Sequence, residues 1–170
     1  MNATVLCANI SIGTHYLSNH NIHVKVCSEK EHDRVLWLKQ LNPTAECIEG
    51  DFLTEEVYQK VVKAHKNNNS KLVIITCPCQ DGSTLNTSDK KGTRDISKLI
   101  KPAVDFIKET KGPFFVFENV PQWYNSSPEA AQEFLHGRTI WQYIQDELND
   151  IYKLNAGYFS AKNYGTSVHP

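Results

Sequence analysis

The chain has 170 residues, of which 40% are hydrophobic and 22% are charged, and its formal net charge at pH 7 is −1. These values are typical of a water-soluble globular protein, and the length suits one domain of about 100–200 residues. They exclude a disordered or low-complexity chain and a protein that coats nucleic acid by bulk charge. The longest purely apolar runs, of which Leu72–Ile75 is one, are far shorter than the about 20 residues that a membrane-spanning helix needs.

The first half of the chain alternates strand-like and helical patterns. Thr54 is expected to cap the last of these helices, because its hydroxyl oxygen can accept a free first-turn N–H. In chain order we expect a strand at Thr4–Asn9, a short helix near Gly13–Asn19, a strand at His23–Glu29, a helix at Glu31–Leu41, a strand at Ala45–Asp51 and a helix at Glu55–Lys66.

The second half continues the alternation. Lys71–Cys77 is the clearest buried strand, because its consecutive apolar residues leave nothing polar to face water. After a polar loop we expect a helix from Thr93 or Asp95 to Thr110, a strand at Phe114–Val120, a helix at Thr139–Asn149 and a sixth strand at Tyr152–Phe159.

This alternation predicts a doubly wound α/β fold, with a mostly parallel sheet and helices on both faces. No repeat or linker divides the chain, so residues 1–170 are expected to form one domain. Sheets of this kind bind ligands beyond the carboxyl ends of their strands, where polar groups should converge on one crevice. The residues at those ends are Asn9–Ile12, Glu29, Asp51 with Phe52, Pro78–Gln80, and Glu118 with Asn119.

Two acidic residues at these ends suit a nucleoside ligand. Glu29 ends the second strand, where nucleotide-binding folds hold ribose hydroxyls, although a solvated charge is an alternative. Asp51 could accept a hydrogen bond from an adenine amino group while Phe52 packs on the ring, although Gly-Asp viewed alone is more typical of a turn. The first turn has one glycine where phosphate-binding turns usually carry three, so Asn9 and Ser11 favour a ligand without phosphate.

A cysteine and a carboxylate stand at the ends of the two most apolar strands. Cys79 could act as a thiolate nucleophile on the loop after Lys71–Cys77, although a lone cysteine there is more often structural. Glu118 lies inside the apolar run Phe114–Val120, and burying its charge without a functional reason would be costly. Adjacent strands would bring Cys79 and Glu118 together, with burial raising the pKa of Glu118.

The five cysteines are Cys7, Cys27, Cys47, Cys77 and Cys79. An odd number, with no export signal at the start of the chain, predicts reduced thiols and a cytoplasmic protein. The spacing of Cys77 and Cys79, with no second pair, predicts no metal site.

A basic cluster follows Cys79. It has a local balance of +3, which predicts phosphate contact, with a solvated helix face as the alternative. Its residues are Lys90, Lys91, Arg94, Lys98 and Lys101, against Asp89 and Asp95.

Six segments, in this order, resemble the motifs of the cytosine-C5 DNA methyltransferases. They are V-L-C-A-N-I-S-I-G-T-H-Y-L, S-E-K-E, G-D-F, P-C-Q-D-G-S, F-E-N-V-P-Q and N-A-G-Y-F-S-A-K-N-Y-G. The resemblance covers nearly the whole chain, and Pro-Cys-Gln followed by Glu-Asn-Val is its most specific part. It implies a Rossmann-like methyltransferase fold and transfer of a methyl group from S-adenosylmethionine to C5 of cytosine in DNA.

The resemblance also implies a role for each motif. Cys79 would add to C6 of a flipped-out cytosine, and Glu118 would bind N3 and the exocyclic amine of the base. The implied cofactor residues are Asn9, Ile10, Ser11, Ile12, Glu29, Asp51, Phe52 and Pro78, and the implied substrate residues are Gln80, Ser83, Arg94, Asn119 and Val120.

The chain departs from the family pattern in two places. The first motif has Cys7 where an aromatic residue is usual, and Asn9 and Ser11 where glycines are usual. The last motif, which begins at Tyr164, lacks its usual basic continuation, and no target-recognition region follows. We therefore expect an incomplete catalytic part, truncated near the last strands, that needs a second polypeptide or a missing C-terminal region.

Three alternatives stay open. The chain could be an inactive remnant or a regulatory subunit that binds a partner protein. It could also methylate cytosine in tRNA, as one branch of the family does. A cysteine-dependent hydrolase is the third, although no histidine is obviously placed to pair with Cys79.

Overall fold

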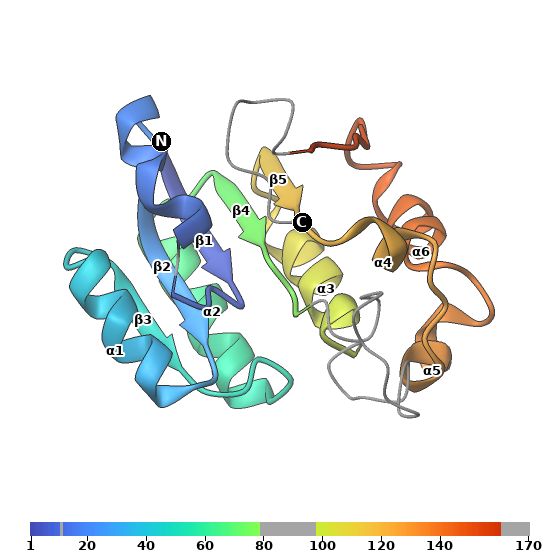
Figure 1. The fold of residues 1–170 in the computed structure, drawn as a ribbon, viewed down its shortest axis with the longest axis horizontal. Helices are drawn as coiled ribbons and strands as arrows, with labels where there is room; N and C mark the ends of the chain where they lie inside the picture. The colour runs from blue at the N-terminus through green and yellow to red at the C-terminus, as the bar shows by residue number, and fades with distance from the viewer. Residues whose placement is uncertain (11, 79–97, 161–170) are drawn as a thin grey trace.

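A five-stranded parallel sheet forms the centre of the computed structural model, which describes residues 1–10, 12–78 and 98–160 (Figure 1). The strand order is β3-β2-β1-β4-β5, so β3 and β5 are the edges. The doubly wound α/β fold is therefore confirmed. The strands are β1 (Asn2–Leu6), β2 (His23–Glu29), β3 (Glu46–Glu49), β4 (Leu72–Ile75) and β5 (Phe114–Phe117).

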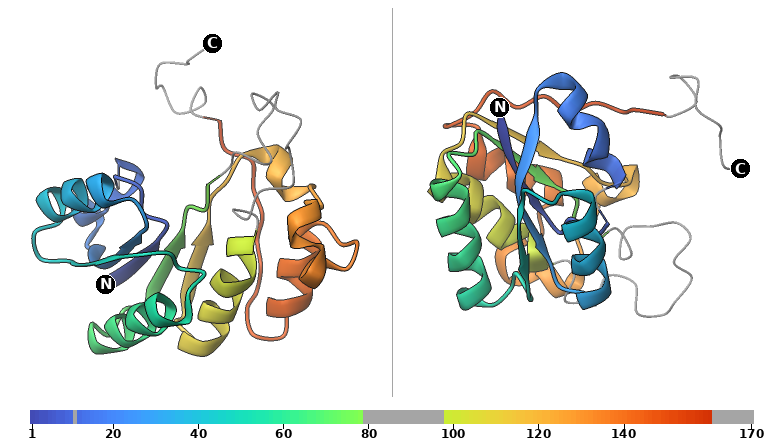
Figure 2. Two further views of the ribbon diagram at one scale, coloured as in Figure 1. Left: turned by 90° about the horizontal axis from the view of Figure 1, so that it is seen from below. Right: turned by 90° about the vertical axis from the view of Figure 1, so that its left-hand side faces the viewer.

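Helices cover both faces of the sheet (Figure 2). The 3-10 helix η1 (Ile12–His20) and α1 (His32–Leu41) lie on one face, and α2 (Glu55–Asn67), α3 (Ile100–Thr110) and α6 (Ile140–Leu148) lie on the other. Three short helices precede α6, namely α4 (Pro121–Tyr124), η3 (Glu129–Ala131) and α5 (Gln132–Leu135). None of the helices in the described ranges is long and apolar enough to cross a membrane.

The two faces of the sheet carry separate apolar cores. Leu6, Val73 and Ile75 pack toward α2, α3 and α6 in the larger core. Val5 and Ile74 point to the opposite face, where the smaller core lies and where Leu38 of α1 packs. The alternation of side chains along a strand explains this division, because successive residues face opposite sides.

A buried histidine joins the sheet to the larger core. His65 of α2 is 3% exposed, its Nδ1 lies 2.9 Å from Thr4 Oγ1, and its ring meets Phe106 edge-on at 5.3 Å. Burial, together with the charges of Lys66 and Lys71, lowers the pKa of His65 to about 4. The ring is therefore neutral and structural near pH 7.

Two local expectations are wrong. Thr54 precedes α2 as predicted, but its hydroxyl donates to the Asp51 carbonyl at 2.8 Å and does not cap the helix. Tyr152–Phe159 is not a strand, because it forms no hydrogen-bonded ladder with any strand of the described residues.

Candidate functional site

The carboxyl ends of β1, β2, β3 and β4 meet, as the topology predicts. Cys7 follows β1 and Cys77 follows β4, and the hydrogen bond with the Cys77 side chain raises the pKa of Cys7. Burial raises it further, as do the negative charges of Glu29 after β2 and Asp51 after β3. Four side chains from four strand ends therefore lie within electrostatic reach of one another.

Glu29 is held by the backbone around it. Its side chain is 6% exposed, which rules out the alternative of a solvated charge. Oε2 accepts the Asn9 N–H at 2.7 Å, and Oε1 accepts the N–H groups of Lys30 at 3.0 Å and Glu31 at 3.1 Å. Because a carboxylate offers about four acceptor positions, one position on Oε2 is left for a ligand hydroxyl.

The turn after β1 adopts a backbone that glycine would favour. Cys7 has φ of 54° and Asn9 has φ of 50°, both in the left-handed region. That region is disfavoured for residues with a Cβ, although asparagine tolerates it better than most. Asn9 is exposed and Ile10 is half-buried, whereas Ser11 and the side chain of Ile12 lie outside the described residues.

Asp51 and Phe52 are adjacent in sequence but lie in different environments. Burial opposes ionisation of Asp51, but bonds from Lys30 Nζ at 2.8 Å and the Leu53 N–H at 3.0 Å outweigh it and lower its pKa. The Phe52 ring is 4% exposed and packs against Tyr58 and Phe106 in the larger core. The Asp51 carboxylate is therefore held at the end of β3 by Lys30 and Leu53, whereas Phe52 has only a small part of its surface free for a ligand.

The loop that leads from β4 to Cys79 begins at the half-buried Pro78, and most of it lies outside the described residues. Of the basic cluster, Lys98 and Lys101 are described and exposed, and Lys101 Nζ pairs with Asp105 at 2.6 Å. The expected site residues that fall outside the described ranges are Cys79, Gln80, Ser83 and Arg94, and Lys90 and Lys91 fall there too.

Glu118 differs from its expected setting. We predicted a buried carboxylate within a strand, but β5 ends at Phe117 and Glu118 is exposed just beyond it. The chain turns there into α4, so the Glu118 side chain leaves the apolar layer. Its backbone N–H still donates to the Ile75 carbonyl at 3.0 Å, which keeps Glu118 beside the end of β4.

Asn119 ties the two loops together, which sequence reasoning did not foresee. Its Nδ2 donates to the Cys77 carbonyl at 2.9 Å, and its Oδ1 accepts the Val120 N–H at 2.9 Å. The loop that leads to Cys79 and the loop that carries Glu118 are therefore joined through one side chain. The signal in the sequence was an asparagine directly after Glu118, at the end of a strand adjacent to β4.

A groove opens beside Glu118, with a volume of about 730 Å³. All of β5 lines one wall, and Tyr152–Phe159 line another. Tyr124 and Trp141 stack at 4.9 Å and also line it. The described residues contain no group of three or more His, Cys, Asp or Glu side chains that could hold a metal ion.

Comparison with known proteins identifies a family and a fold. Residues 1–168 match the family model of the C-5 cytosine-specific DNA methylases. A solved structure from E. coli, described as a DNA modification methyltransferase encoded within a prophage, has a TM-score of 0.63 and 16% identity. The match covers 88% of this chain and 38% of that chain, so this chain spans well under half of its length. The likeness to that structure shows the fold alone, and no curated protein matches the sequence.

Proposed function

This chain belongs to the C-5 cytosine-specific DNA methylase family, and we propose that residues 1–170 form one catalytic domain that methylates C5 of cytosine in DNA. The observation that carries the proposal is the family match over residues 1–168. The hydrogen bond from Asn119 to the Cys77 carbonyl supports it, because it links the loops of the two reacting side chains.

The proposed chemistry starts at Cys79. A base inside the duplex is out of reach, so the target cytosine must be flipped out. The Cys79 thiolate adds to C6, and the exposed Glu118 carboxyl binds N3 and the exocyclic amine as charge develops on the ring. C5 then receives the methyl group and its proton passes to solvent water. The electrons of the C5–H bond re-form the C5–C6 double bond as the C6–sulfur bond breaks and releases the Cys79 thiolate.

S-adenosylmethionine would supply the methyl group from its positively charged sulfonium. The residues at these strand ends fit S-adenosylmethionine. They present the carboxylates of Glu29 and Asp51, and the cofactor carries a positive charge and a ribose diol. The free acceptor position on Glu29 Oε2 suits one ribose hydroxyl. Asp51 suits the adenine amino group, and Pro78 and the turn from Asn9 to Ile12 complete the proposed site.

We propose that DNA and a second polypeptide are the partners. The basic residues between positions 90 and 101, Arg94 among them, would contact phosphate, while Gln80, Ser83 and Val120 would lie near the flipped base. The second polypeptide would carry target recognition, since this chain covers 38% of the prophage methyltransferase that it resembles.

The rival proposal is an inactive relative that keeps the fold. Two non-glycine residues in the left-handed region after β1 favour it, because that turn would approach the cofactor. Asp51 is also already paired with Lys30. The rival predicts that the chain binds no cofactor.

A covalent trap tests the proposed function. The chain is incubated, with and without a candidate partner polypeptide, with S-adenosylmethionine and duplexes that carry 5-fluorocytosine in every neighbouring-base context, because fluorine at C5 blocks release of the cysteine. We expect a protein–DNA adduct that Cys79→Ser abolishes and that the remote control Cys47→Ser retains. Absence of a Cys79-dependent adduct on every duplex, both with and without the partner, would contradict the proposal.

A further inference from the structure

Two cysteines face each other across the strands β2 and β3. Cys27 and Cys47 are direct partners in the parallel register of these strands, and both are free thiols. Both side chains lie on the face of the sheet that carries the smaller core, where α1 packs on the two strands. Neighbouring strands are about 4.8 Å apart, which falls within the Cα–Cα separations of about 4.4–6.8 Å that a disulfide allows. The fold therefore holds the two thiols where a bond between their sulfur atoms can form.

The two thiols differ in their access to solvent. Cys27 is fully buried, with 0% of its surface exposed, whereas Cys47 is half-buried. Cys47 also lies on β3, an edge strand that has a neighbouring strand on one side only. A small reagent in solution therefore reaches Cys47 first, and Cys27 meets only what Cys47 has become.

The surroundings of the two thiols divide their roles further. The Cys27 S–H donates to the Cys47 sulfur, and this bond lowers the pKa of Cys47; burial opposes the change, and the positive charge of Lys39 on α1 adds to it. The same bond, followed by burial, raises the pKa of Cys27. The Cys47 thiol in turn donates to the Ala45 carbonyl at 3.8 Å. An accessible cysteine that favours the thiolate, beside a second cysteine that can resolve it, is typical of peroxide-reactive sites.

A second pair of thiols, Cys7 and Cys77, lacks these properties. The hydrogen bond with Cys77, then burial, then the negative charges of Glu29 and Asp51 raise the pKa of Cys7. Cys77 is only 5% exposed. Burial and negative charge both disfavour a thiolate. This pair is therefore an internal control, since it places two thiols in contact without making either of them reactive.

We propose that Cys47 is a site of oxidation by hydrogen peroxide and that Cys27 closes a reversible disulfide with it. The Cys47 thiolate attacks one peroxide oxygen, the O–O bond breaks and hydroxide leaves, so Cys47 becomes a sulfenic acid. The Cys27 sulfur then attacks the Cys47 sulfur, and the leaving hydroxide takes the Cys27 proton as water. In total, two thiols are oxidised to one disulfide and one peroxide is reduced to two water molecules. This site is separate from Cys79 and does not depend on methyl transfer.

Peptide mapping of the full chain tests the site. The reduced protein is treated with hydrogen peroxide, its remaining thiols are blocked with iodoacetamide, and it is cut with trypsin without reductant. Cleavage after Lys30 separates Cys27 from Cys47, so a disulfide leaves two linked peptides that dithiothreitol separates again. We expect this link to form at least about 10-fold faster than any link between Cys7 and Cys77.

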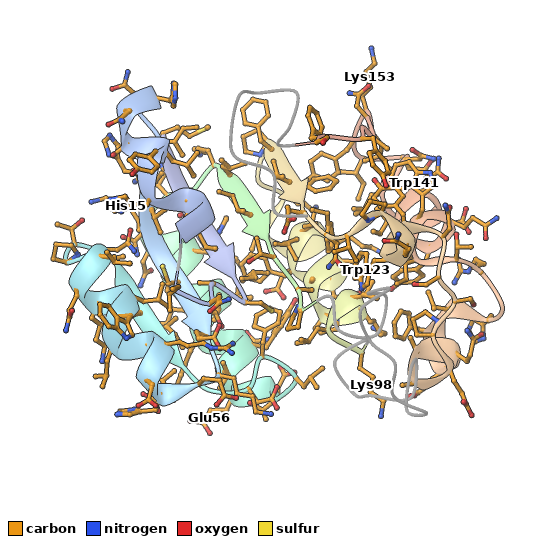
Figure 3. All side chains as sticks on the ribbon, in the orientation of Figure 1. His15, Glu56, Lys98, Trp123, Trp141 and Lys153 are labelled. Atoms are coloured by element: carbon orange, nitrogen blue, oxygen red, sulfur yellow. The ribbon has the colours of Figure 1, made fainter. Side chains whose placement is uncertain are left out.

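Matched variants separate the two roles. In Cys27→Ala, Cys47 should remain a sulfenic acid, which dimedone captures, because the resolving thiol is gone. Lys39→Gln should slow the oxidation of Cys47 by about 2–5-fold, since it removes the nearby positive charge. Lys153→Gln is the control and should not slow it, because Lys153 is exposed beside β5, at the opposite edge of the sheet (Figure 3).

Two results would overturn the proposal. One is a Cys47 thiol that stays unmodified while the same peroxide oxidises Cys79, and the other is a Cys47 that links only to cysteines other than Cys27. Both are measured on the unaltered chain, so they do not depend on how well the variants fold. Neither involves DNA or the cofactor, so failure of the proposed function is seen separately in the covalent trap.

Discussion

The two halves of the proposed site differ in how they are completed. At the ends of β1, β2 and β3, buried Glu29 accepts three backbone N–H groups and Asp51 pairs with Lys30. At the ends of β4 and β5, Glu118 is exposed beside an open groove, and Asn119 is the side chain that bridges the two strand ends. The first half is held by bonds within the chain, whereas the second leaves Glu118 exposed and the groove open.

The largest expected effect comes from Glu29→Ala. The variant leaves three N–H groups without their charged acceptor and should lower the free energy of unfolding by about 3 kcal/mol. Urea denaturation measures the change, with the exposed Glu31→Ala as a control that costs about 0.5 kcal/mol or less. Equal costs for the two variants would show that the first half is not organised by Glu29.

Acid should weaken the larger core through His65, which belongs to neither half of the site. Its pKa is about 4 in the folded protein and about 6.5 when unfolded. The unfolded chain therefore binds the proton first as the pH falls, so stability declines between about pH 6.5 and pH 4 by about 2–3 kcal/mol. Below about pH 4 this decline ends, because both states are protonated. Denaturation is measured across this pH range. The decline in the free energy of unfolding that is due to His65 should be absent in His65→Gln and present in the exposed control His136→Gln.

Asn119→Ala removes the hydrogen bond that links the loop after β4 to the loop after β5. Loss of two hydrogen bonds should cost about 1–2 kcal/mol of stability. If Asn119 positions the reacting loops, the rate of methyl transfer at saturating DNA should fall at least about 10-fold while KM for DNA changes little. The exposed Gln122→Ala on α4 is the control. A larger change in KM than in kcat would mean that Asn119 binds DNA instead of positioning the loops.

The smallest effect is expected at the turn after β1. Asn9→Gly relieves a left-handed backbone at a position with φ of 50°, and we expect it to stabilise the protein by about 0.5–1 kcal/mol. Thermal unfolding measures it against Asn9→Ala, which should destabilise. Destabilisation by glycine would show that the asparagine side chain has a role of its own in this turn.

The sequence predicted best where a pattern is set by burial alone. The apolar run of β4 and the periodicity of α6 lie within one or two residues of their expected bounds, and α6 begins with a capping box at Thr139. The convergence of Glu29 and Asp51 followed from the parallel topology, whereas the place of Cys7 beside them was not predicted. Each of these features depends on one segment or on the order of segments.

Features that depend on what lies beside a segment were not predictable. Phe114–Val120 has the composition of a longer strand, but the turn into α4 ends β5 at Phe117 and exposes Glu118. Tyr152–Phe159 has strand-forming residues, but a groove separates it from β5 and it pairs with no strand of the described residues. The Phe52 ring packs against Tyr58 and Phe106 in the core, and the local sequence does not reveal this contact.

Calorimetric titration of S-adenosylmethionine into the chain alone tests the central claim, that this chain is the cofactor-binding catalytic part of a cytosine methyltransferase. We predict binding of one molecule in the micromolar range, weakened at least about 10-fold by Asp51→Ala, since one good charged contact contributes about 1.4 kcal/mol or more. Circular dichroism of the variant confirms that it folds. No binding by the folded chain would contradict a catalytic role and favour an inactive relative that keeps the fold.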